Sequence, residues 1–330
     1  MKFDKVLVTG GSGFLGSHIC EQLSKAGHTV VALVRKSSNK KFLEALPNVE
    51  LALGSIEDRK SIDAAMNGVD AVIHSAGLVK ARTEAEFYEC NTQGTVNLLD
   101  SAIENAPNLK RFVQVSSLEA SGPSLDGKPV PLAQEAPLSR YGRSKLAAEK
   151  ECLSRKDKLP VVILRPAAIY GPRDVEIFEM FKAVKNRQYP VVGDGSMVCC
   201  YSYGPDSAAA CIRAIEADVP SGSIYFIDDG EPVALKVAVG EYLVEAMGTT
   251  PLFKIGLPLG VVKIAALGVE AYGKVRGKAV MLTREKVNVM RHSWVCESTK
   301  TRTDLGWEPS VGFREGLKKT AEWYRENGWL

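Results

Sequence analysis

Tyr141 and Lys145 lie four residues apart in the stretch SRYGRSKLAAEK, residues 139–150. The stretch has a helical pattern, and side chains four apart project from the same face of a helix. A phenol has an unperturbed pKa of about 10 and is a poor acid–base catalyst at neutral pH, but a fixed ammonium group beside it favours the phenolate. Among the ten tyrosines of the chain, only Tyr141 has a lysine four residues later. We therefore predict that Tyr141 is a general acid/base and that Lys145 assists it.

Two serines, Ser116 and Ser117, follow the apolar run 112–115. If that run is a strand of a parallel sheet, the serines lie at the carboxyl edge, where ligands bind. A hydroxyl there can donate a hydrogen bond to the substrate oxygen whose proton Tyr141 exchanges. The alternative is a loop that the serines cap without any ligand, which serine does well.

The first apolar run of the chain leads directly into a glycine-rich turn, VTGGSGFLGSH at residues 8–18. Glycine reaches positive φ and has no Cβ, so Gly10, Gly13 and Gly16 would let the backbone approach a pyrophosphate, and the next helix would supply amide groups. Residues 16–18 read Gly-Ser-His rather than Gly-Lys-Ser/Thr, which argues against a nucleoside triphosphatase. The turn predicts a dinucleotide site, and a tight turn without a ligand is the alternative.

Arg35 lies 19 positions after Gly16, where an NAD-specific site usually carries an acidic residue that binds the ribose hydroxyls. An acid would repel a 2′-phosphate, whereas Arg35, with Lys36 and the hydroxyls of Ser37 and Ser38, would attract it. We therefore favour NADP(H) as the cofactor. Binding of NAD(H), with Arg35 in solvent, is the alternative.

Short apolar runs alternate with helical patterns along the first half of the chain, which is typical of βαβ units and a parallel sheet. We predict an α/β fold with a Rossmann-type, doubly wound sheet whose strands fall at 6–8, 30–34, 49–53, 71–73, 112–115 and 161–164. The predicted dinucleotide-binding domain covers 1–170. A smaller, mostly helical substrate-binding portion covers 171–330, from which segments can return to the sheet, and its predicted helices are 176–187, 205–217, 234–247 and 312–327.

The composition is that of an ordinary globular protein, with 330 residues and a formal net charge of +3. No run of lysine or arginine is long enough for a nucleic-acid footprint, so a small-molecule substrate is expected. The seven cysteines are scattered and show no ligand spacing, which predicts neither a disulfide framework nor a metal site. Because the N-terminus also lacks a secretory signal pattern, we predict a cytoplasmic protein.

One segment, GLPLGVVKIAALGVEAY at 256–272, is strongly apolar but is interrupted by Lys263 and Glu270. It is too short and too charged to span a membrane. The two charged residues, with Lys274, share one helical face and leave the rest apolar. We favour a helix packed on the core; a lid over a lipophilic substrate and a helix in peripheral contact with a membrane are the alternatives.

The motifs together resemble those of the extended short-chain dehydrogenases/reductases, a group that also contains nucleotide-sugar epimerases and dehydratases. The resemblance rests on Thr9-Gly10-x-x-Gly13-Phe14-x-Gly16, the serines at the strand end, Tyr141-x-x-x-Lys145 and LRPAAIYGPRD at 164–174, in this order. The ending at 298–328 is similar as well, so the resemblance covers the whole chain. It implies an NAD(P)-dependent oxidoreductase in which Tyr141 is the acid/base, Lys145 its helper and a ribose ligand, and Ser117 the donor to the substrate oxygen.

The same resemblance extends the predicted cofactor site beyond the turn. Asn91 matches a position behind the active site, 166–169 match a segment that contacts the carboxamide, and Ser55 replaces an aspartate often found near the adenine. The resemblance also implies a homodimer through helices near 84–105 and 138–156. The full prediction for the cofactor site is Gly10, Ser12, Gly13, Phe14, Leu15, Gly16, Arg35, Ser55, Ile56, Ala76, Asn91, Tyr141, Lys145, Pro166, Ala168 and Ile169.

Particular residues separate the branches of this group. Epimerases resemble one another in an arginine for the substrate phosphate where this chain has Cys199, and dehydratases in an aspartate where it has Leu118. SSLEASGPS, 116–124, instead resembles the 3β-hydroxysteroid dehydrogenase branch, and the apolar MVCCYSY, 197–203, suggests a lipophilic substrate, sterol-like or a keto acid. We therefore predict hydride exchange with a secondary alcohol or ketone. A nucleotide-sugar epimerase and a redox-inert NADP-binding regulator are the alternatives.

Overall fold

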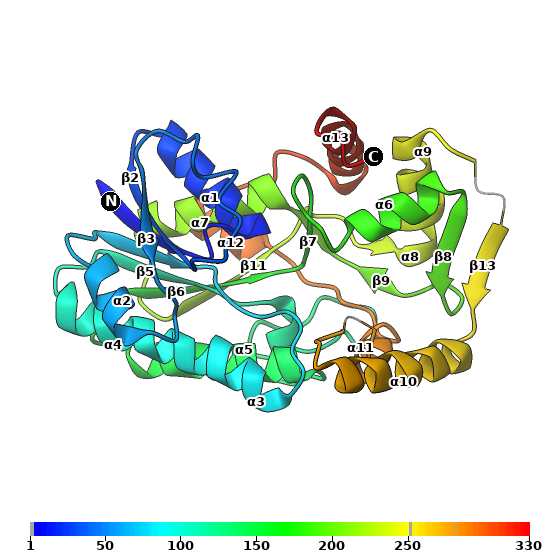
Figure 1. The fold of residues 1–330 in the computed structure, drawn as a ribbon, viewed down its shortest axis with the longest axis horizontal. Helices are drawn as coiled ribbons and strands as arrows, with labels where there is room; N and C mark the ends of the chain where they lie inside the picture. Colours follow the sequence, from blue (N-terminus) through cyan, green and yellow to red (C-terminus); the bar gives the residue numbers. More distant parts are fainter. Residues whose placement is uncertain (1–2, 251–252, 281) are drawn as a thin grey trace.

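A seven-stranded parallel sheet forms the centre of the molecule (Figure 1). The computed structural model describes residues 3–250, 253–280 and 282–330. The strand order across the sheet is β11-β6-β5-β4-β1-β2-β3. Successive strands are added on one side of β1 up to β3 and on the other side from β4 onward, so the strand order reverses between β1 and β4. The strands are β1 (Lys5–Thr9), β2 (Thr29–Val34), β3 (Val49–Leu53), β4 (Ala71–His74), β5 (Arg111–Val115), β6 (Val161–Pro166) and β11 (Ser223–Ile227).

Helices cover both faces of this sheet, because alternate side chains of each strand point to opposite faces. In β1, Val6 and Val8 enter the cluster under one helical layer, while Leu7 enters the cluster under the other. The first layer contains α1 (Phe14–Lys25), α7 (Gly204–Glu216) and α12 (Thr299–Leu305). The second contains α2 (Arg59–Ala65), α3 (Glu84–Phe87), a π-helical turn (Tyr88–Gln93), α4 (Gly94–Asn105) and α5 (Arg140–Ser154).

The predicted doubly wound fold is confirmed, and each predicted strand is present within two residues of its expected ends. β11 comes from the second half of the chain and pairs in parallel with β6, in the register Ser223↔Val162. The predicted domain boundary at residue 170 stays a prediction. Two elements from beyond it belong to the first portion: β11 joins the central sheet, and α7 lies in the first helical layer.

The second portion packs around aromatic side chains. Tyr201 and Phe313 stack with their ring centroids 3.9 Å apart, and Tyr170 meets Phe313 edge to face. Gly316 lies so close to Tyr170 that a Cβ on it would be 2.0 Å from the phenol oxygen, so helix α13 (Phe313–Glu326) is held tightly on this cluster. The short strands here pair as β7 (Ala168–Tyr170) with β10 (Tyr201–Tyr203), β8 (Gln188–Val192) with β13 (Phe253–Leu257), and β9 (Val198–Cys199) with β12 (Val233–Ala234).

Most strands of this portion are shorter than those of the central sheet. The helix predicted at 234–247 is broken by a π-helical turn, Ala238–Leu243, between two shorter helices. The strands are β7 (Ala168–Tyr170), β8 (Gln188–Val192), β9 (Val198–Cys199), β10 (Tyr201–Tyr203), β12 (Val233–Ala234) and β13 (Phe253–Leu257). The helices are α6 (Phe178–Lys185), α8 (Leu235–Val237), α9 (Val244–Met247), α10 (Leu259–Arg276), α11 (Arg284–Val289) and α13 (Phe313–Glu326).

The segment predicted as a helix at 256–272 begins as strand β13 and becomes helix α10 after Pro258, whose fixed φ suits a helix start. The favoured interpretation, a helix packed on the core, is wrong for most of its surface. Only Val262, Ala266 and Gly273 of α10 are buried, and two of them join Val287 in a small cluster separate from the main cores. None of the described helices combines the length and the hydrophobicity that crossing a bilayer requires.

Candidate active site

The glycine-rich turn lies at the carboxyl end of β1, beside the point where the strand order reverses. Gly10 has a φ of +72°, and a Cβ on it would lie 2.8 Å from the amide nitrogen of Ala76. A Cβ on Gly16 would lie 2.1 Å from the carbonyl oxygen of Gly10. Gly13 is the N-cap of α1 and has no side chain to satisfy the first amides of that helix. The turn therefore fits a dinucleotide, whose phosphates these amides can bind.

A buried polar network links the carboxyl ends of β1 and β4. His74, the last residue of β4, has its two ring nitrogens 2.7 Å from the Thr9 hydroxyl and 3.0 Å from the Thr95 hydroxyl. Ala76 donates its backbone N–H to the same Thr9 hydroxyl. Burial lowers the pKa of His74 to about 3, so the ring is neutral in the folded protein. This network holds β1 and β4 in place on either side of the crevice.

We expect His74 to make stability depend on pH. The unfolded chain protonates this ring below about pH 6.5, whereas the folded protein does not until about pH 3. The stabilisation from neutral His74 is thus complete above pH 6.5 and is lost as the pH falls. The stability difference between wild type and His74→Gln should shrink by about 2 kcal/mol between pH 7.5 and 5. Urea unfolding measures it, with His292→Gln as control; an unchanged difference would contradict this account.

Asn91 ties the π-helical turn to α5. Its amide oxygen accepts from the N–H of Leu78 at 2.7 Å, and its amide nitrogen donates to the Ser144 hydroxyl at 2.9 Å. Ser144 precedes Lys145 on α5, so Asn91 fixes the helix that carries the predicted catalytic pair. The predicted contact of Asn91 with the cofactor stays a prediction.

Tyr141 lies in the first turn of α5, which Ser139 caps by accepting from the N–H of Gly142 at 2.9 Å. Burial, the largest effect, and the Glu119 carboxylate raise the pKa of the Tyr141 phenol, while hydrogen bonding with the nearby Ser117 hydroxyl lowers it. The phenol is therefore protonated at neutral pH in this structure. The protonated phenol can act as a proton donor, and the roles predicted for Tyr141 and Ser117 toward a substrate stay predictions.

Lys145 is buried one turn after Tyr141 and donates to the carbonyl oxygen of Val115 at 2.6 Å. Burial lowers the pKa of its ammonium to about 8, and the nearby Glu149 carboxylate raises it in part. Its nitrogen would lie 3.6 Å from a Cβ on Gly77, at the carboxyl edge of β4. The effects that shift the pKa of Tyr141 in this structure come from burial, Glu119 and Ser117, and the assistance of Lys145 to the phenol stays a prediction.

A buried ion pair lies under these residues and was missed from the sequence. Arg165 on β6 and Glu149 on α5 are each 1% exposed and form two hydrogen bonds, at 3.0 and 2.6 Å. Ser116 donates to the same carboxylate, so the neighbouring Ser117 is the serine that remains beside Tyr141. The spacing of Glu149, four residues after Lys145, and the arginine of LRPAAIYGPRD were the available signals.

A cavity of about 50 Å³ borders Tyr141, and Val280 and Thr283, which lie between α10 and α11, are among its lining residues. Its walls include the apolar side chains of Val79, Phe87 and Val280. The lining cations are each ion-paired with a carboxylate, in the pairs Lys80–Glu176, Arg140–Glu285 and Lys286–Glu119. Among the described lining residues, none is thus a free cation for a substrate phosphate.

The remaining predicted residues lie along the carboxyl edge of the sheet, as the fold requires. Arg35 is exposed directly after β2, and the Ser55 hydroxyl accepts from the N–H of Glu57 in the turn after β3. Ile56 is buried against Gly94, and Phe14 is half-buried and lies close to Gly204. Ser12 lies in the turn, Leu15 in the first turn of α1, Ala76 after β4 and Pro166 at the end of β6, and Ala168 and Ile169 lie in β7.

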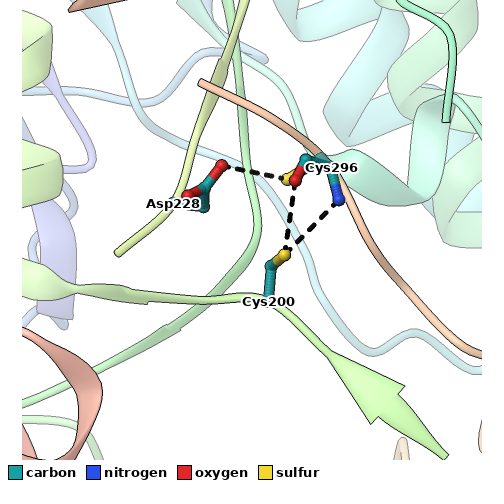
Figure 2. A group of neighbouring side chains, drawn as sticks. All are labelled: Cys200, Asp228 and Cys296. Atoms are coloured by element: carbon teal, nitrogen blue, oxygen red, sulfur yellow. Dashed lines mark hydrogen bonds between the residues drawn. The ribbon is translucent and has the colours of Figure 1, made fainter. Parts of the chain in front are cut away.

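A cluster of thiols lies elsewhere in the second portion (Figure 2). Cys200, Asp228 and Cys296 are buried, with one donor atom each within 4.8 Å of the others, a grouping that the sequence spacing did not indicate. Cys296 donates to the Asp228 carboxylate, and its N–H donates to the Cys200 sulfur at 3.4 Å. Hydrogen bonding with Cys200 and burial hold the pKa of Cys296 well above its usual range. Because metal ligation needs thiolates, this arrangement fits hydrogen-bonded thiols better than a metal site.

A parallel sheet with a glycine-rich turn at its crossover point, and a buried tyrosine and lysine beside a cavity, define a Rossmann-type enzyme that acts with a bound dinucleotide. Residues 6–227 match the NAD dependent epimerase/dehydratase family, and the chain belongs to this family. The predicted family and the prediction of an enzyme are confirmed.

Similar proteins in this family act on different substrates. The chain is 30% identical to the 2-alkyl-3-oxoalkanoate reductase of Stenotrophomonas maltophilia, over 96% of this chain and 98% of the relative. It is 29% identical to the ceramide reductase of Caulobacter vibrioides, over 98% and 96%.

Solved structures of family members extend the likeness over the whole fold. UDP-glucose 4-epimerase of Thermotoga maritima, with UDP-glucose, has a TM-score of 0.80 at 25% identity and covers 98% of this chain and 99% of its own. The dTDP-glucose 4,6-dehydratase of Streptomyces venezuelae, with NAD bound, has a TM-score of 0.80 at 25% identity, over 99% and 98%.

Proposed function

We propose that this enzyme exchanges a hydride between a nicotinamide dinucleotide and a ketone or secondary alcohol on a lipophilic molecule. The observation that carries the proposal is the Tyr141 phenol beside the Ser117 hydroxyl, at a cavity whose lining cations are already ion-paired. The two reductases that resemble the chain over its whole length support the same reaction, since one name describes a ketone with alkyl chains, a 2-alkyl-3-oxoalkanoate, and the other a lipid, ceramide. A sterol-like molecule and a keto acid both fit this class.

The residues divide the work of ketone reduction. The bound dinucleotide supplies the hydride that adds to the carbonyl carbon. Ser117 donates a hydrogen bond to the carbonyl oxygen, and Tyr141 transfers its phenolic proton to that oxygen, which completes the alcohol. Lys145 donates a hydrogen bond to the Val115 carbonyl oxygen, and burial lowers the pKa of its ammonium group to about 8. The positive charge of this ammonium group then favours the phenolate that remains. In the direction of oxidation each step reverses.

The proposal is tested by measuring reduced nicotinamide during incubation with a long-chain 3-oxo ester, a hydroxysteroid and UDP-glucose, each with NAD(H) and with NADP(H). Net turnover with the first or second compound supports it. Inversion of the sugar without net change in the cofactor would overturn it.

Epimerisation of a nucleotide sugar is the second candidate, favoured by the likeness to the UDP-glucose epimerase structure. Cys199, which occupies the place of the phosphate-binding arginine, is buried, and its backbone forms an isolated parallel β-bridge with that of Trp294. A diphosphate would thus lack its charge-assisted partner at this position. Binding of UDP-glucose distinguishes the candidates directly.

For the cofactor, we propose a preference for NADP(H) over NAD(H) because Arg35 and Lys36 are exposed directly after β2. Arg35→Asp should weaken NADP(H) binding by roughly 10- to 100-fold and leave NAD(H) affinity nearly unchanged, since only the former carries a 2′-phosphate. Fluorescence titration measures both affinities. Lys158→Asp, an exposed position at the opposite edge of the sheet, is the control; equal losses for both cofactors would contradict the role of Arg35.

We also propose that the protein is a cytoplasmic homodimer. All seven cysteines are free and buried, which supports a reducing compartment. The proposed dimer contacts are the segments 84–105 and 138–156, which include α4 and α5, and sedimentation equilibrium measures the assembly.

A further inference from the structure

Helix α10 turns an apolar face to solvent. Five of the eleven large hydrophobic side chains that are exposed in the described part of the chain lie on this one helix. Ile264 is 71% exposed and Val275 is 85% exposed. Helical spacing places both on the side opposite the buried residues, and the same face carries Val261, Leu267, Gly268, Ala271 and Tyr272. An ordinary surface helix has the reverse arrangement, with its charged residues outward.

The charged residues of α10 lie at the edges of this face. Lys263 and Lys274 flank one side, and Arg276 flanks the other, where its guanidinium lies 5.7 Å from the ring of Tyr272. Glu270, the acidic residue of this helix, is on the inner side and is paired with Arg284. The edges are therefore positive, which matches the cationic borders and aromatic residue of helices that lie on anionic membranes.

A second copy of the chain fits this face less well. Two copies related by a two-fold axis would pack their α10 helices antiparallel about Gly268. Lys263 of each copy would then approach Lys274 of the other, and like charges at that distance repel. Anionic lipid head groups meet the same lysines with opposite charge.

The apolar face is also close in the chain to the active site. α10 leads through Val280 and Thr283 to Lys286, and these three residues line the cavity beside Tyr141. Figure 1 shows α10 and α11 along one side of the molecule, next to the end of α5 that carries Tyr141. A membrane under α10 would thus lie near the entrance for a lipophilic substrate.

We propose that α10 docks the enzyme on an anionic bilayer, with Val261, Ile264 and Val275 among the side chains that enter the lipid interface and the lysines at its rim. The purpose of this docking, delivery of a membrane-dissolved ketone, rests on the proposed function, but the docking itself does not. The proposed binding partner of α10 is a phospholipid surface.

The test is flotation of the full-length protein with vesicles of phosphatidylcholine containing phosphatidylglycerol, and with pure phosphatidylcholine. Wild type should bind the anionic vesicles, and Ile264→Glu/Val275→Glu should lower that affinity by roughly 30-fold because two apolar contacts are lost. Lys263→Glu/Lys274→Glu should weaken binding to the anionic vesicles. Leu51→Glu/Leu53→Glu, on the exposed edge of β3, is the matched control and should bind as wild type.

Two further readouts separate the outcomes. If the wild-type protein floats with neither type of vesicle, the docking proposal is overturned. It is also overturned if the wild-type protein self-associates and only the Ile264→Glu/Val275→Glu variant abolishes that association. Turnover of a short, water-soluble ketone should be equal in that variant and in wild type. If no ketone is turned over but vesicles are bound, the proposed function fails while the docking stands.

Discussion

Tyr141→Phe is expected to lower kcat by roughly 100- to 10,000-fold, because the variant keeps the ring but has no proton to transfer. The phenol is the group that Ser117 contacts at the cavity, and the described lining residues include no second tyrosine. The dinucleotide should bind the variant nearly as well as wild type, since the glycine-rich turn is unchanged. Steady-state kinetics with a turned-over ketone and nucleotide titration measure the two effects.

The matched control for this prediction is Tyr272→Phe, at an exposed tyrosine of α10. It should leave kcat unchanged. Ser117→Ala should lower kcat less than Tyr141→Phe does, because it removes a hydrogen-bond donor and not the proton source. Full activity in Tyr141→Phe would show that another group supplies the proton and would remove the basis of the proposed function.

Arg165→Met should destabilise the protein by about 3–5 kcal/mol, because it leaves the Glu149 carboxylate buried without its partner. Arg165 also donates to the Ser121 hydroxyl at 2.9 Å and to the Leu132 carbonyl at 2.8 Å, so the substitution leaves these acceptors unsatisfied as well. Urea unfolding at pH 7 measures the change in free energy. Removal of both charges in Arg165→Met/Glu149→Met should restore part of the loss.

The control for this second prediction is Arg155→Met, because Arg155 pairs with Glu151 and Asp100 at the surface of α5. Surface pairs of this kind contribute about 0–1 kcal/mol. If both variants lose the same small amount, the buried pair is not the support for α5 that the structure indicates.

Much of the fold and part of the site could be predicted from local patterns. The apolar runs gave strand positions because a buried parallel strand has apolar side chains on both faces. The turn at 8–18 was recognisable because glycine is needed where a Cβ would meet the Gly10 carbonyl. Tyr141 and Lys145 were found together because a helix brings residues four apart to one face.

Other features depend on contacts between distant parts of the chain. Glu119 raises the pKa of Tyr141 and pairs with Lys286, 167 residues later, which no local pattern indicates. The hydrogen bond from Ser116 to the buried Glu149 carboxylate, which leaves Ser117 as the serine beside Tyr141, could not be predicted from local patterns either. The interpretation of α10 as a core helix was wrong because hydrophobicity alone does not say whether a core is present beneath it.

For the first half of the chain, the sequence by itself determined the order of strands and helices, the glycine-rich turn and the tyrosine–lysine pair, since periodicity and short spacings set each of them. Only the tertiary structure decided which carboxylates face the phenol and the amine, which carboxylates pair with the cations that line the cavity, and which side of α10 is exposed to solvent. The physical reason is that charge effects and burial depend on distance through space, and the groups involved are brought together only when the chain folds.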